Sequence, residues 1–90
     1  MFTTVVYLMV FVKTASSAAW KGSHSTSWED PENWSSGFVP NEFTNVTIKN
    51  SPLNNPIINS NVTIKSLTAE KSSLLKIEKG FRLNIIGDRK

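Results

Sequence analysis

The sequence predicts an all-β chain, built as a short parallel β-helix (β-solenoid) with an aromatic N-terminal cap. Residues 45–50 (NVTIKN) return sixteen positions later as residues 61–66 (NVTIKS), with five of six positions identical. Each copy alternates apolar and polar residues, the period-two pattern of a strand with one buried face. Short strands at a short period are typical of stacked coils, because one coil cannot bury its own apolar face. An antiparallel β-sandwich is the alternative, since hairpins give similar spacing.

Residues 1–19 have the features of a secretory signal peptide. The apolar run at residues 5–12 is too short to span a bilayer, which takes about 20 residues. It suits the apolar core of a leader, and Ser17-Ala18-Ala19 offers small residues for cleavage before Trp20. The alternative is that the run forms a buried first strand. We therefore expect a secreted or cell-surface protein without a membrane span.

Residues 20–43 are predicted to form a cap of turns and irregular chain, because Gly, Ser and Pro are dense there. The first coil of a stack leaves one end of the core open, and large rings cover such an end efficiently. The residues expected to seal it are Trp20, Trp28, Trp34 and Phe38. The functional alternative is a carbohydrate-binding platform, with Trp28 and Trp34 as ligand-binding residues whose rings stack on sugars.

Residues 44–90 are predicted to form the solenoid coils. Val62 and Ile64 are expected to stack over Val46 and Ile48, one coil further on, and the two prolines of residues 51–56 suit a corner between strands. The side chains expected to fill the core are Val46, Ile48, Ile58, Val62, Ile64, Leu75, Ile77, Leu83 and Ile85. No aromatic cap follows them, so we expect further solenoid coils of a longer protein as a partner of this end.

The residues that could carry chemistry do not form a recognisable set. Glu29, Asp30 and Glu32 lack the ligand spacing of a calcium loop, and His24 is the only histidine. Cysteine is absent, which excludes disulfides and thiolate metal sites. The net charge is +3 and the basic residues are scattered, so a nucleic-acid partner is not expected. We predict no catalytic residues, no metal and no cofactor. Three N-x-S/T motifs begin at Asn33, Asn45 and Asn61, and we interpret them as strand and turn residues.

An ordered set of short motifs resembles a known kind of protein. Trp20-x-Gly22, Trp28, Asn33-Trp34-Ser35-x-Gly37-x-Val39-Pro40, the first NVTI strand and Pro56-x-Ile58 follow one another. This order is similar to the N-terminal segment of large secreted surface proteins of the Bacteroidetes type, many exported by the type IX system. A related pattern occurs in the glycine-rich β-helical module of some animal surface proteins. We expect no C-terminal sorting or anchoring domain in these 90 residues, unlike in both of those kinds of protein. The resemblance implies an exported, repetitive, right-handed β-helix-like module and no catalytic residues.

These observations together predict a non-enzymatic, exported, adhesin-like structural module of the cell surface. A carbohydrate-binding module that uses exposed Trp rings, with extracellular glycans as partners, is one alternative. The other is the N-terminal fragment of a β-helical polysaccharide lyase or hydrolase, whose catalytic coils would lie outside these residues.

Overall fold

The structure is a computed structural model, which describes residues 16–50 and 52–87. This part of the chain is all-β apart from one short 3-10 helix, so the prediction of an all-β chain is confirmed. The elements in chain order are β1 (Ser16–Trp20), η1 (Pro31–Asn33), β2 (Thr44–Ile48), β3 (Ile57–Ile58), β4 (Val62–Ile64), β5 (Ser66–Ala69), β6 (Lys76–Ile77) and β7 (Leu83–Ile85). No helix among the described residues is long and apolar enough to cross a membrane.

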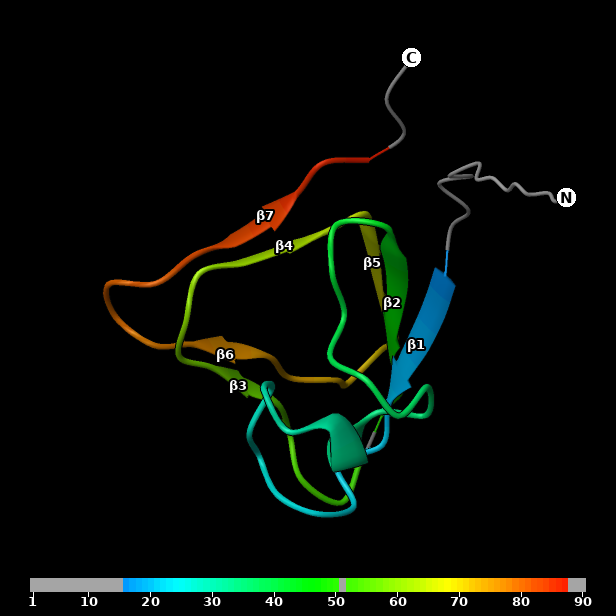
Figure 1. The fold of residues 1–90 in the computed structure, drawn as a ribbon. Helices are drawn as coiled ribbons and strands as arrows, with labels where there is room; N and C mark the ends of the chain where they lie inside the picture. The colour runs from blue at the N-terminus through cyan, green and yellow to red at the C-terminus, as the bar shows by residue number, and fades with distance from the viewer. Residues whose placement is uncertain (1–15, 51, 88–90) are drawn as a thin grey trace, which may run out of the picture.

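The strands form three small sheets, which Figure 1 shows around a shared interior. Their strand orders are β1-β2-β5, β3-β6 and β4-β7. The chain therefore visits the three sheets in the same order twice, first with β2, β3 and β4 and then with β5, β6 and β7. Every ladder between these strands is parallel, which contradicts the antiparallel sandwich alternative.

The register corrects the predicted stacking of the two hexapeptide copies. Val46 lies opposite Leu67 in the first sheet, whereas Val62 lies opposite Leu83 in another sheet. The copies thus belong to the first and the third of the strands β2, β3 and β4, and the partner of Asn45 is Ser66, 21 positions later. The physical reason is that the hexapeptide encodes an amphipathic strand but no particular partner. The lengths of the corners decide which strands meet.

The core is formed by inward side chains of β1 to β4 together with the tryptophans. Its buried apolar members are Ala18, Trp20, Trp28, Trp34, Val46, Ile48, Ile58, Val62 and Ile64. The four residues at and after position 75 that were expected in the core are only partly buried. Leu75 and Leu83 are half-buried against this cluster, but Ile77 is 40% and Ile85 is 51% exposed.

The register explains why this part of the core prediction is wrong. Ile77 lies opposite the fully buried Ile58, and Ile85 lies opposite the fully buried Ile64. Both therefore occupy inward positions, but in the last layer of the stack. Unlike Ile58 and Ile64, Ile77 and Ile85 are not part of the buried cluster, so these two side chains meet solvent.

The strand β1 overlaps the predicted leader. The apolar run at residues 5–12 lies outside the described residues, but Ser16–Trp20 pairs in register with Thr44–Ile48. Ala18 is buried beside Val46, and the Ser16 backbone N–H donates to the Phe43 carbonyl over 3.0 Å. In this structure the folded domain thus begins before Trp20, the predicted first residue after cleavage. Export remains a prediction.

Candidate functional site

The three tryptophans form one cluster of edge-to-face rings, here called the Trp cluster. The ring centroids of Trp20 and Trp34 are 5.1 Å apart at an interplanar angle of 79°, and those of Trp28 and Trp34 are 4.7 Å apart at 77°. Such T-shaped pairs place the positive edge of one ring against the negative face of another. The Trp34 indole N–H donates to the Trp28 carbonyl over 2.9 Å. The Trp28 indole nitrogen is buried without a hydrogen-bond partner among the described residues.

The burial of these rings contradicts the sugar-platform role predicted for Trp28 and Trp34. Both side chains are fully buried, so neither ring presents a face on which a sugar could stack. The role of Phe38 as part of the aromatic seal is also corrected, because Phe38 is 43% exposed. Its neighbour Val39 packs against the core instead. The inward position of this segment therefore falls one residue later than the sequence pattern suggested.

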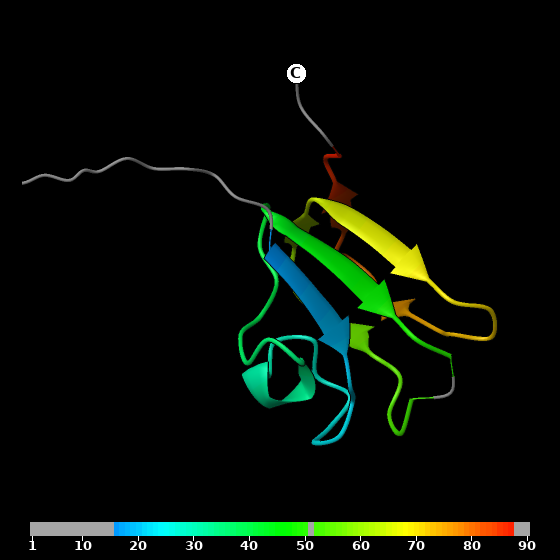
Figure 2. The same ribbon diagram turned by 90° about the vertical axis from the view of Figure 1, so that its right-hand side faces the viewer.

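The residues around the Trp cluster cover the edges of two sheets. β1 pairs with β2, and Ser27 forms a parallel bridge with Ile57 of β3. On either side of this bridge, the Trp28 N–H donates to the Ile57 carbonyl over 3.2 Å, and the Ile57 N–H donates to the Thr26 carbonyl over 2.8 Å. In Figure 2, η1 lies on the β1 side of the first sheet, and β5 forms the opposite edge. The segment thus satisfies backbone groups that an uncovered first turn would leave unpaired.

Asn33 holds the loop of residues 23–33 together. Its side-chain oxygen accepts from the backbone N–H groups of His24 (2.8 Å) and Ser25 (2.9 Å). Its amide nitrogen donates to the Ser25 hydroxyl (3.0 Å) and the Ser27 carbonyl (2.9 Å). Two acceptor sites and two donors are the full capacity of an Asn amide. The N-x-S/T motif that begins at Asn33 is therefore not available for glycosylation in the folded chain, since its nitrogen is buried and bonded.

Gly22 explains the Trp-x-Gly motif. It is buried with φ of +61°, and a Cβ built on it would lie 2.2 Å from the Asn54 carbonyl oxygen and 2.6 Å from the Trp20 indole nitrogen. The same Asn54 carbonyl accepts from that indole nitrogen over 2.6 Å, and the Asn54 amide donates to the Gly22 carbonyl over 2.7 Å. Glycine is required here because the backbone and the indole converge on one carbonyl. Sequence reasoning missed the roles of Asn33 and Asn54, since their partners lie up to 34 positions away.

Glu29, Asp30 and Glu32 do not converge on one point. Asp30 caps η1, where its side chain accepts from the Glu32 N–H over 3.0 Å, and its other oxygen bonds to the His24 ring. Glu29 accepts from the Ser60 hydroxyl instead. The hydrogen bond to Asp30, followed by the charges of Asp30 and Glu32, raises the pKa of His24. The bond to His24, followed by that from the Glu32 backbone, lowers the pKa of Asp30.

These contacts form a capped turn at residues 30–34. The other His24 ring nitrogen is 3.9 Å from a Glu32 oxygen, which is too far for a hydrogen bond. The described residues contain no group of three or more His, Cys, Asp or Glu side chains placed to hold a metal ion.

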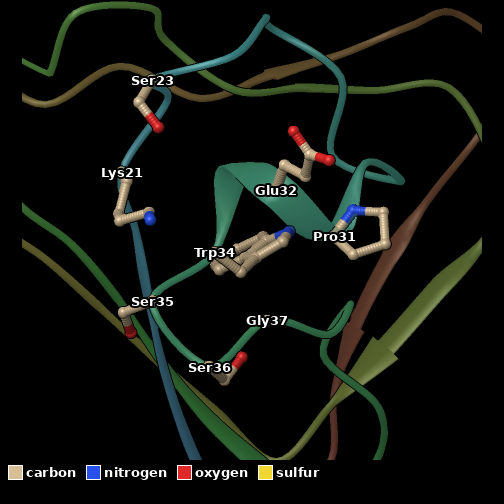
Figure 3. Close-up of a pocket in the computed structure, with 8 residues that line it drawn as sticks. All are labelled: Lys21, Ser23, Pro31, Glu32, Trp34, Ser35, Ser36 and Gly37. Atoms are coloured by element: carbon tan, nitrogen blue, oxygen red, sulfur yellow. The ribbon is translucent and has the colours of Figure 1, made fainter.

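A polar hollow of about 450 Å³ lies beside η1. Figure 3 shows Lys21, Ser23 and Ser35 along one side and Pro31 and Glu32 along the other. The Ser35 hydroxyl already accepts from the Ala19 N–H over 2.9 Å, and the Ser36 hydroxyl donates to the Phe38 carbonyl over 3.0 Å. The hollow therefore offers one ammonium, one carboxylate and few free hydroxyls, without an exposed aromatic face.

Several exposed apolar side chains lie in the last three strands and the corners between them. We call the free sides of β5, β6 and β7, with their connecting corners, the open edge. Five of the exposed large apolar side chains are in this part of the chain: Leu74, Ile77, Phe81, Ile85 and Ile86. An apolar hollow of about 720 Å³ adjoins it, with Leu53, Leu74 and Ile77 among its lining residues.

The comparisons with known proteins identify a family but no function. No curated protein and no solved structure matches the chain. The profile of one family, DUF8693 (Domain of unknown function), matches residues 19–88. This stretch contains the Trp cluster, both turns of strands and the open edge. The chain therefore belongs to the DUF8693 domain family.

Proposed function

We propose that the chain is a structural β-solenoid module in which β2-β3-β4 and β5-β6-β7 are two stacked coils. The observation that carries this proposal is the register of the inward side chains. Val46 and Leu67, Ile58 and Ile77, and Ile64 and Ile85 form one column in each sheet. Stacking of like coils buries a continuous core that neither coil could form alone.

In this arrangement the Trp cluster closes the end of the stack beside the first coil. Trp20 continues the inward column of Ile48, and Trp34 and Trp28 follow it by ring contact. Three large apolar rings cover an end more completely than one further short strand would. The burial of these rings favours a closing role over carbohydrate binding, so we propose no glycan site.

We further propose that the module is non-enzymatic and acts at the cell surface after export. The support is the apolar run at residues 5–12 and the resemblance to secreted surface proteins. The contacts of the charged side chains agree with a structural role, because Asp30 and His24 bond to each other at the start of η1 and Glu29 bonds to Ser60.

Insertion of a whole coil tests the solenoid. A second copy of residues 45–65 placed after Lys65 adds 21 residues, the spacing that relates β2 to β5. We expect the variant to fold and to have a higher denaturant midpoint and a larger m-value, because one more interface between coils is formed and more surface is buried. Urea unfolding followed by circular dichroism measures both quantities.

Two control insertions separate register from added length. A scrambled version of the same residues retains composition but loses the alternation. A second copy of residues 45–60, placed after Ser60, adds the sixteen-residue sequence repeat, which is not the spacing between paired strands. Both should destabilise the chain, since the inward columns no longer align. Equal midpoints for all three insertions would contradict the proposed stacking.

A further inference from the structure

We propose that the His24–Asp30 pair is a pH-sensitive clasp on the loop of residues 23–33, which covers the outer edge of β3. The inference goes beyond the structural role proposed above and does not depend on how the coils stack. The loop is fastened most firmly in mildly acidic solution, where His24 is protonated and Asp30 is ionised. It opens more often as the imidazole loses its proton, and each opening uncovers Trp28 and the backbone of Ile57.

The loop takes the place of a strand along the edge of β3 that faces away from β6 (Figure 1). The Trp28 N–H donates to the Ile57 carbonyl over 3.2 Å, and the Ile57 N–H donates to the Thr26 carbonyl over 2.8 Å. The same loop carries the fully buried Trp28 ring into the core. Opening of the loop therefore exposes an aromatic ring together with an unpaired strand edge, to which another chain can pair.

Most contacts that close the loop do not titrate near neutral pH. The Asn33 amide bonds to His24 and Ser25 at the start of the loop and to the Ser27 carbonyl in its middle. The Asp30 N–H also donates to the Ser27 carbonyl, over 3.2 Å. The exception is the His24 ring, whose Nδ1 bonds to a carboxylate oxygen of Asp30. Because imidazole changes its charge near neutral pH, this contact between the two ends of the loop depends on pH.

The charges that act on His24 are both negative. Asp30 contacts Nδ1, and a Glu32 oxygen lies 3.9 Å from Nε2. The hydrogen bond to Asp30, followed by the charges of Asp30 and Glu32, raises the pKa of His24 above its ordinary value of 6.5. Other charged side chains of the loop and its neighbours are not among the causes of this shift: Lys21, Glu29 and Lys76. Protonation of His24 is thus favoured by groups of the loop itself.

The two pKa shifts define the pH range in which the clasp is strongest. Folding raises the pKa of His24, so its contribution to stability is complete below 6.5 and is lost as the pH rises through the higher folded value. Folding lowers the pKa of Asp30, mainly through the bond to His24, so its contribution is complete above 3.8 and is lost as the pH falls through the lower folded value. Above this range a neutral imidazole can still donate to Asp30, but without the added strength of a charge-assisted bond.

NMR titration of the full chain tests the electrostatic part. His24 is the only histidine, so its ring signals are unambiguous. We expect a His24 pKa above 6.5 in the wild type, a large decrease in Asp30→Asn and a smaller one in Glu32→Gln, because Asp30 is the main cause of the shift. Asp30→Asn retains a side-chain oxygen that can cap η1. Glu42→Gln is the matched control, since Glu42 is exposed and does not act on His24, and it should leave the pKa unchanged.

Amide hydrogen exchange of the same chains tests the opening of the loop. Protection factors of the Trp28 and Ile57 N–H groups are compared with that of the Glu70 N–H, which donates to the Ile48 carbonyl outside the loop. From about pH 5.5 to about pH 8, we expect loop protection to fall about two- to fivefold relative to Glu70, the range typical of an exposed ion pair. This fall should be absent in His24→Gln, which removes the titrating ring at a position whose side chain is 59% exposed.

Three results would overturn the inference: equal His24 pKa values in the wild type and Asp30→Asn, loop protection in the wild type that does not change with pH, or an unchanged pH dependence in His24→Gln. The wild-type titration and exchange remain decisive even where Asp30→Asn opens the loop at every pH. None of these results affects the coil-insertion test, so the solenoid proposal and the clasp proposal can fail separately.

Discussion

At the scale of single residues, the folded chain depends on a few polar and glycine positions around the Trp cluster. Asn33 uses all four hydrogen-bonding sites of its amide inside the protein. Asn54 connects the corner after β2 to both Trp20 and Gly22. Removal of such a contact is costly, because each buried polar group that is left unpaired lowers the free energy of unfolding by about 1–3 kcal/mol. These residues therefore hold the irregular segment in one conformation.

Gly22→Ala should destabilise the chain by about 2–4 kcal/mol, as its Cβ would overlap the Asn54 carbonyl and the residue would carry backbone strain. Gly80→Ala is the matched control: Gly80 also has positive φ, at +92°, but a Cβ there meets nothing within 4 Å. It should cost only the backbone term, about 1–2 kcal/mol. Thermal or urea unfolding of both variants measures the difference. Equal losses would show that the close approach at Gly22 does not matter.

At the scale of elements, the same alternating pattern has different outcomes according to the layer in which a strand lies. β4 and β7 are paired, and each has inward aliphatic residues at its first and third positions. Those of β4 are buried, whereas Ile85 of β7 is half-exposed. Among the described residues neither strand has a second strand partner, so the difference depends on what packs against the inward side chains: Val62 and Ile64 belong to the buried cluster that contains the tryptophans.

The substitution Ile64→Asp should unfold the domain, because it places an unpaired carboxylate in the core and removes a fully buried side chain. Ile85→Asp changes the paired residue of the same column, but in the exposed last layer. Measured on dilute protein, it should cost less than about 1 kcal/mol. Urea unfolding followed by circular dichroism compares the two. A stable Ile64→Asp variant would mean that the inward register of β4 is wrong.

At the scale of the whole molecule, the two ends of the stack differ. β1 and the Trp cluster lie on the side of β2, β3 and β4, whereas β5, β6 and β7 pair on the other side of these three strands (Figures 1 and 2). The buried tryptophans are therefore on one side of the core, and the exposed Ile77 and Ile85 are on the other.

Export can be measured on producing cells. We expect the protein in the surface or medium fraction, where added protease reaches it on intact cells. A variant with Leu8→Arg and Val10→Arg should stay inside, because charges interrupt the apolar run of residues 5–12. Mass spectrometry then identifies the first residue of the exported chain. If this residue is Ser16 or an earlier one, the exported chain retains the whole of β1. Protein found only inside cells, wild type and variant alike, would contradict the surface role.

The sequence alone determined the class of structure and the position of most strands. The hexapeptide alternation located β2 and β4, and the density of Gly, Ser and Pro located the irregular segment. These features are local, because amphipathic periodicity and turn chemistry act over a few residues. Only the tertiary structure decided that the two copies lie in different sheets, that Phe38 stays exposed while Val39 packs inward, and that Ile77 and Ile85 are uncovered. Each of these depends on corner lengths and on which layer is last, and no short stretch of sequence contains that information.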